Sequence, residues 1–231
     1  MILGDFESVG KITVPKNAHL NRLHLTVDIN NFPSVEIKSL IYSKIKNLPT
    51  NLNENFKSNI QVIGICDTFS FICIKRNNGN GYEFIEKWNG MYGEDLFISF
   101  CDKKPKYGFA AAEDYRKNPT FVVFDLIKIM SMLPNIKIEA DPSWGFTFTQ
   151  NAENPLLIQF DNFDGNKKAA SPAFLIAMLL KHHLKIIKSE IGEKPKELGF
   201  WFLDKFKAEE KEQIKYGIKD ACGLLKYEKF V

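Results

Sequence analysis

The chain has 231 residues, of which 45% are hydrophobic and 26% are charged. These proportions are typical of a globular protein and exclude a disordered or fibrous chain. With 31 basic and 28 acidic side chains, the formal net charge of +3 is too balanced to indicate a nucleic-acid partner.

The chain does not open on a basic stretch followed by an apolar run, and no run of about eighteen apolar residues occurs. Its four cysteines are scattered, without a Cys-x-x-Cys pair, and indicate reduced thiols rather than a metal site. We therefore expect a soluble cytoplasmic or nuclear protein that has no membrane partner and binds no metal.

Residues 1–57 are expected to form an N-terminal extension. Leu23–Ile29 alternates apolar and polar side chains, which predicts a strand, and the apolar residues of Val35–Ile45 recur at roughly helical spacing. The polar, asparagine-rich stretch Pro49–Ser58 is typical of a connector, so we place a domain boundary after residue 57.

The region after this boundary predicts several short strands. Ile60–Ile65 and Phe69–Ile74 are β-rich and are separated by a short turn, which indicates a hairpin. Asn77–Gly81 is typical of a second turn, and Tyr82–Glu86 and Leu96–Phe100 continue the series. The pattern predicts a meander of four strands.

Helices and strands then alternate along the rest of the chain. The expected helices are Ala110–Lys117, Val122–Met132, the stretch from Ser171-Pro172 to Glu190, and Ala208–Cys222. The expected strands are Trp144–Thr149, Leu156–Phe160, Leu198–Leu203 and Leu225–Val231. The order of strand, helix and strand indicates a parallel crossover.

Several short motifs follow one another in an order that a known family shares. Within Gly108–Asp125, the motifs Gly-x-Ala-Ala, Asn-Pro and Val-Phe-Asp occur at that family's spacing. Ser171-Pro172 opens a long helix, and Cys222-Gly223-Leu224 follows the next one. In this order the motifs resemble the first half of the ATPase domain of the heat-shock protein 70 family.

The resemblance covers residues 58–231 and implies the family's actin-like, ribonuclease-H-like fold. The expected class is therefore α/β, with lobe I of the nucleotide-binding domain forming a mixed sheet plus a small α+β insertion. In the family a second lobe follows, and ATP lies between the two lobes. We expect the extension, residues 1–57, to pack on this half-domain and to cover apolar surface that the second lobe otherwise covers.

The family's phosphate loop, Gly-Ile-Asp-Leu-Gly-Thr-Thr, matches Gly64–Ser70 here. Such a loop needs glycine because several backbone N–H groups must point at the phosphates. This loop is shorter, has cysteine in place of the aspartate and contains no glycine in the turn. We therefore expect a vestigial nucleotide loop at Gly64, Cys66, Asp67 and Thr68, in which Asp67 and Thr68 could be slipped substitutes.

The family's phosphate lysine matches Ile127, and Lys128 lies one place further on. On a helix this shift turns the amine by about 100°, so Lys128 is expected to be a vestigial, solvated lysine. The family's Thr-Val-Pro-Ala-Tyr strand end becomes Phe202–Phe206 and loses a hydroxyl that helps to position water. Because one lost contact commonly costs about 10²- to 10³-fold in rate, these changes predict a pseudo-ATPase with no catalytic residue and no cofactor.

The first functional hypothesis is a catalytically inactive module that binds or scaffolds other proteins. The alternative is an ATP-binding chaperone-type ATPase that retains weak affinity for ATP with magnesium. A third hypothesis is an unrelated enzyme with a chance resemblance, which a structure without the order of hairpin and crossover would favour.

Three further residues carry expectations of their own. His182 and His183 are neighbours in the long helix and point about 100° apart, so they cannot form a metal pair on one face. We expect both to be surface or boundary histidines. Phe202 is expected to lie in the core on a central strand.

Overall fold

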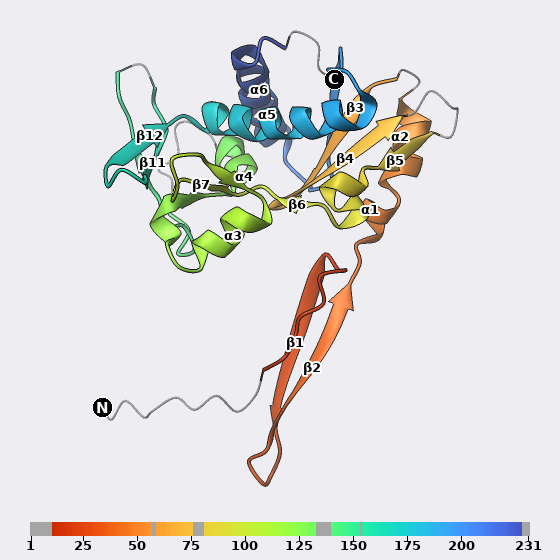
Figure 1. Cartoon of the computed structure of the whole chain (residues 1–231), viewed down its shortest axis with the longest axis vertical. Coiled ribbons are helices and arrows are strands. Elements are labelled where there is room, and N and C mark those ends of the chain that lie inside the picture. The colour runs from red at the N-terminus through yellow and green to blue at the C-terminus, as the bar shows by residue number, and fades with distance from the viewer. Residues whose placement is uncertain (1–10, 57–58, 76–80, 133–139, 153, 228–231) are drawn as a thin grey trace. The chain divides into compact units, whose positions relative to one another are not determined.

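A computed structural model describes residues 11–56, 59–75, 81–132, 140–152 and 154–227 of the chain (Figure 1). The chain consists of two compact units, Met1–Asn47 and Leu48–Val231. The boundary between them lies before the one that we predict at residue 57. The second unit therefore contains residues 58–231 together with helix α2 (Leu48–Asn55).

The first unit is an antiparallel hairpin of β1 (Leu20–Val27) and β2 (Pro33–Leu40), followed by the short helix α1 (Ser43–Lys46). The predicted first strand is confirmed in part, since β1 begins before it and ends at Val27. The helix predicted over Val35–Ile45 is wrong, because most of that stretch pairs with β1 as a strand.

The register of this hairpin places its apolar side chains on one face. Leu23 lies opposite Ile37 and Leu25 lies opposite Val35, so these four side chains share one side of the ribbon. Leu25 is 65% exposed. A two-stranded hairpin needs further packing to be stable in water. That residues 1–57 pack on the half-domain stays a prediction.

The second unit combines a mixed sheet with smaller sheets and helices. Its strands are β3 (Gln61–Cys66), β4 (Phe69–Lys75), β5 (Tyr82–Phe84), β6 (Glu94–Asp95), β7 (Ile98–Ser99), β8 (Lys106–Tyr107), β9 (Val122–Val123), β10 (Thr147–Thr149), β11 (Leu157–Asp161), β12 (Lys167–Ala170) and β13 (Leu198–Phe202). Its α-helices are α2, α3 (Phe109–Tyr115), α4 (Leu126–Ser131), α5 (Pro172–Ile191) and α6 (Ala208–Leu224). Short 3-10 helices occur at Glu86–Trp88, Gly90–Tyr92 and Pro119–Phe121.

The main sheet has the strand order β13-β3-β4-β5, and β6 also pairs with β4. Strands β3 and β4 form an antiparallel hairpin, and β13 runs parallel to β3. The predicted hairpin and the predicted α/β class with a mixed sheet are therefore confirmed. Strands β10, β11 and β12 form an antiparallel sheet, and β7, β8 and β9 form another.

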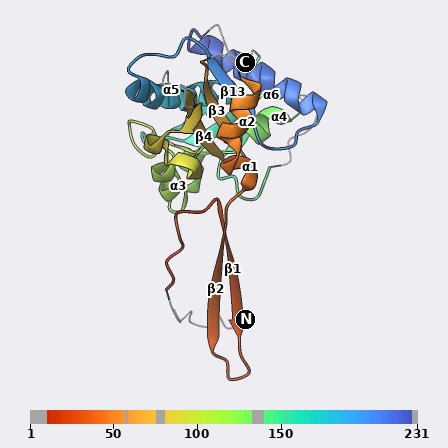
Figure 2. The ribbon, with the colours of Figure 1, turned by 90° about the vertical axis from the view of Figure 1, so that its right-hand side faces the viewer.

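Both faces of the main sheet are buried. Ile63 of β3 pairs with Ile72 of β4 on one face, in the core that α5 and α6 also line (Figure 1). On the opposite face α2 covers β3 (Figure 2), and a Cβ atom on Gly64 would lie 2.7 Å from Leu48 Cδ2. The close approach of this helix therefore explains the glycine. Phe202, expected in the core, packs against it but is half-buried.

Several expectations for the first half of this unit are wrong. Most of the predicted connector Pro49–Ser58 is helical, because α2 buries Leu48 and Leu52 completely. The four strands form no simple meander, since β6 returns to β4 and β7 joins another sheet. The helix predicted over Val122–Met132 begins only at Leu126, after strand β9.

The later elements agree better with the sequence. Helix α5 begins after Ser171, whose hydroxyl accepts the N–H of Phe174, and it ends at Gly192 with φ of +83°. Most of the turn predicted at Asn77–Gly81 lies outside the described residues, and so do residues 228–231 of the predicted closing strand. Residues 225–227 of that stretch are not a strand.

The buried side chains of helix α2 are predicted to contribute to the stability of the second unit. Leu52→Ala is expected to lower the free energy of unfolding by about 2–5 kcal/mol, because it leaves a cavity in place of a buried side chain. Chemical denaturation measures the change. The exposed Glu54 supplies a matched control on the same helix, and Glu54→Ala is expected to change stability by about 0.5 kcal/mol or less. Equal effects of both substitutions would contradict the burial of Leu52 in the second unit.

The packing of the extension is tested by removing residues 1–47, which leaves α2 in place. If these residues cover apolar surface, the shortened chain is expected to associate or to lose cooperative unfolding. Size-exclusion chromatography and thermal denaturation measure the two effects. A shortened chain that stays monomeric and unfolds cooperatively would show that the extension has no such role.

Candidate functional site

The segments matched to the family's nucleotide site meet at one end of the main sheet. Asp67 lies in the β3–β4 turn, Asp204 follows β13, and Asp125 and Lys128 lie at the start of α4. Because β13 runs parallel to β3, the C-terminal ends of these strands are neighbours. The charges of the other three residues act on the carboxyl group of Asp67. The structure thus brings together residues that are far apart in the sequence.

The β3–β4 turn is closed by a carboxylate of the protein itself. Asp67 has a left-handed backbone with φ of +53°, and its N–H donates to Asp204 Oδ2 over 2.6 Å. The Cys66 thiol lies 3.7 Å from Asp204 Oδ1. The carbonyl of Thr68 accepts the N–H of Leu96. One backbone N–H of the turn is therefore taken by a carboxylate.

Lys128 is engaged beside the turn rather than within it. Its ammonium group donates to Asp141 Oδ2 over 2.8 Å and lies 5.3 Å from the ring centre of Trp144. The Trp144 indole N–H donates to Asp125 Oδ2 over 2.8 Å. The lysine side chain is 53% exposed. Asp141 and Trp144 could not be predicted as partners of Lys128 and Asp125, because nothing in their local pattern indicates these contacts.

The cluster is predominantly acidic. Partial burial raises the pKa of Asp67, and the nearby carboxylates of Asp125 and Asp204 raise it further, while Lys128 lowers it. The hydrogen bond to Asp141 raises the pKa of Lys128, so the amine stays charged. A polyphosphate at this place would meet three carboxylates and one amine that already has an anionic partner.

Another carboxyl group near the turn escaped the sequence analysis. Asp95 of β6 pairs with Phe69 of β4, the residue that follows the turn. Burial raises the pKa of Asp95 to about 6, and Glu94 adds to the rise. Within the described ranges, no three or more His, Cys, Asp or Glu side chains come close enough together to hold a metal ion.

The prediction for the histidine pair is wrong for one of its members. His183 is 1% exposed, with Nε2 at 2.9 Å from Ser70 Oγ and Nδ1 at 2.7 Å from the Leu179 carbonyl oxygen. Its ring also packs against Trp88, with the ring centres 4.5 Å apart. The residue therefore joins α5 to β4. His182 lies at the boundary, as predicted.

Comparison with known proteins supports the resemblance that the motifs predict. The chain is 27% identical over 135 residues to a heat shock protein of Pyricularia oryzae. These residues make up 57% of this chain and 22% of that protein, so the chain spans about a fifth of its relative. This distant, partial match confirms the similarity to the heat-shock protein 70 family. No family model matches the chain. Among the residues that the structure describes, no helix is both long and apolar enough to cross a membrane.

The burial of His183 predicts a pH-dependent stability. Burial lowers the pKa of His183 to about 4 in the folded chain, against about 6.5 when unfolded. The unfolded chain therefore binds the proton more tightly. The contribution of the neutral His183 ring to the free energy of unfolding is fully present above about pH 6.5. It is lost as the pH falls through about 4, and the total loss is about 3 kcal/mol.

Denaturation at a series of pH values tests this expectation. In His183→Gln the loss between about pH 6.5 and 4 is expected to flatten, because the titrating ring is gone. His182→Gln is the matched control at the neighbouring, half-buried position and is expected to keep most of the slope. An identical slope in His183→Gln and the unmodified chain would rule out this origin.

Proposed function

We propose that this chain is a degenerate heat-shock-70-like module that binds or scaffolds other proteins and does not turn over ATP. The observation that carries the proposal is the hydrogen bond from the Asp67 N–H to the Asp204 carboxylate. This bond satisfies, with the protein's own negative charge, a donor that the family directs at phosphate.

We also propose that the second unit has the actin-like half-domain fold of lobe I. The strand order β13-β3-β4-β5 supports this, because it joins a hairpin to a parallel strand that comes much later in the chain. The distant match to a heat-shock protein supports it independently. Strands β7 to β12 would then correspond to the small α+β insertion.

Catalysis in this fold requires groups that the chain does not present. The turn at Asp67 and Thr68 has no glycine to turn several N–H groups inward. Lys128 forms an ion pair with Asp141, and Phe202 stands where the family has the threonine hydroxyl. Since the loss of one such contact costs about 10²- to 10³-fold in rate, the combined losses favour an inactive module.

Other proteins are the proposed partners. The net charge of +3 does not favour nucleic acid. Leu23, Leu25 and Val35 are exposed on the apolar face of the first unit's hairpin. Exposed apolar faces of this kind mark sites of protein interaction.

A chaperone-type ATPase with weak affinity for ATP and magnesium is the second candidate. The carboxylates of Asp67 and Asp204 at the same turn favour it, because Mg²⁺ binds preferentially to carboxylate oxygens and phosphates. In that case the cation would offset the repulsion between the carboxylates and the phosphates.

Calorimetric titration of the whole chain with ATP and magnesium separates the two candidates. We expect no binding tighter than about 1 mM, because the turn lacks inward-facing donors and its surroundings are acidic. A complete heat-shock-70 ATPase domain is the positive control. Micromolar affinity, or ATP turnover above background, would contradict the inactive module.

A further inference from the structure

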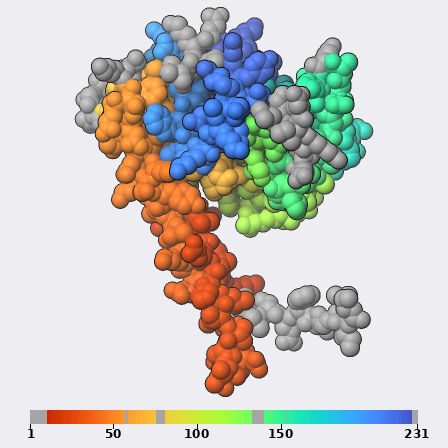
Figure 3. All heavy atoms as spheres, turned by 180° about the vertical axis from the view of Figure 1, so that it is seen from behind, coloured from red at the N-terminus to blue at the C-terminus, as the bar shows by residue number. Residues whose placement is uncertain are grey.

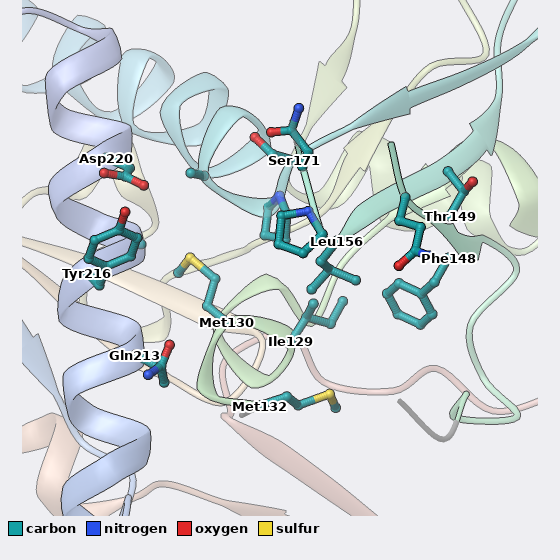
Figure 4. Close-up of a pocket in the computed structure, with 16 residues that line it drawn as sticks. Ile129, Met130, Met132, Phe148, Thr149, Leu156, Ser171, Gln213, Tyr216 and Asp220 are labelled. Atoms are coloured by element: carbon teal, nitrogen blue, oxygen red, sulfur yellow. The ribbon is translucent and has the colours of Figure 1, made fainter. Parts of the chain in front are cut away.

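A groove lies beside α6 in the second unit, and it includes none of the residues of the acidic cluster. Its volume is about 660 Å³, within the usual range for binding pockets. Helix α6 forms one wall, α4 forms the floor, and β10, the residues before β11 and the start of α5 form the other wall (Figure 4). Figure 3 shows α6 at the outer surface of this unit.

The groove is largely apolar. Ile129 and Met130 of α4 form a buried floor, and methionine can adapt its shape to different occupants. Phe148 and Leu156 are half-buried, and Tyr216 is 65% exposed. Aromatic and methionine side chains are enriched in the cores of protein interfaces. The lining therefore fits an occupant with apolar side chains.

The charge of the groove specifies this occupant further. Among the described residues that line it, only Asp220 is charged. Its carboxylate is exposed and forms no ion pair with another described residue. An apolar occupant would remove water from this carboxylate, which costs free energy unless a cation accompanies it. The fitting occupant therefore carries a lysine or arginine.

The open edge of β10 favours an extended peptide. Strand β10 is an outer strand whose partner in the sheet is β11, and Phe148 and Thr149 line the groove. The outer backbone groups of Thr147–Thr149 have no hydrogen bond to any described residue. A peptide that adds a strand can satisfy such groups, while its alternate side chains enter neighbouring pockets.

We propose that this groove binds an extended peptide segment of another protein, with alternating apolar side chains and one basic residue. The peptide backbone pairs with the edge of β10, apolar side chains cover Met130 and Tyr216, and the basic side chain pairs with Asp220. The inference rests on the protein-binding function proposed above, and it specifies the surface and the class of partner.

Selection of peptides by the full chain tests this site. The probe is a phage-displayed library of random peptides of about ten residues, enough to span an edge strand and its pockets. We expect the selected sequences to alternate apolar residues and to contain lysine or arginine. Fluorescein-labelled synthetic copies of the selected peptides then give the Kd by fluorescence polarisation.

Matched variants connect the binding to the groove. Asp220→Asn is expected to weaken binding at least about tenfold, because it removes the partner of the basic side chain. Glu212 carries the same charge on the same helix outside the groove, and Glu212→Gln is expected to change the Kd by about twofold or less. Thermal denaturation checks that each variant is folded.

Backbone pairing has its own test. Methylation of the alternate peptide amides that face β10 is expected to abolish binding, whereas methylation of the other amides leaves it intact. Selected peptides that are insensitive both to Asp220→Asn and to methylation would overturn the groove but leave a protein-binding function standing. A chain that selects no peptide also overturns the groove, and micromolar ATP binding in addition would overturn both proposals.

Discussion

The enclosure of strand β3 is the constraint on which the rest of this structure depends. Ile63 faces the core shared with α5 and α6, while Gly64 faces α2 and leaves room for Leu48. Strands β13 and β4 occupy its two edges. A slip of one residue would exchange the faces of Ile63 and Gly64, so the register of this strand is strongly specified. The positions of the β3–β4 turn and of the end of β13 follow from that register.

This geometry decides the chemistry of the turn. Because β13 runs parallel to β3, Asp204 arrives beside Asp67 and accepts its N–H. Lys128 donates a hydrogen bond to Asp141 and lies over the ring of Trp144. The segments that resemble the nucleotide site of the heat-shock-70 family here form an acidic cluster, in which the Asp67 N–H and the Lys128 amine already have partners. A satisfied donor has little to gain from a new acceptor, since the net free energy of a hydrogen bond depends on the partner that it replaces.

The groove beside α6 has the opposite character. Its apolar floor, the carboxylate of Asp220 and the outer edge of β10 are features that a partner can complete. The attachment of α5 to the main sheet does not involve the groove. His183 of α5 forms a hydrogen bond with Ser70 and packs against Trp88. The packing that stabilises the fold does not depend on the chemistry of the turn or of the groove.

The sequence by itself determined the α/β class, the hairpin around Asp67, the long helix α5 and the absence of glycine from the turn. These features depend on local apolar periodicity, helix caps and turn residues. Local patterns failed over Val35–Ile45, because a short apolar run fits either a helix or a strand until a partner strand is present. Only the tertiary structure decided that helix α2 packs against Gly64, that Asp204 accepts the N–H of Asp67 in the turn and that His183 is buried. Each of these depends on contacts between segments far apart in the sequence, and a local pattern carries no information about them.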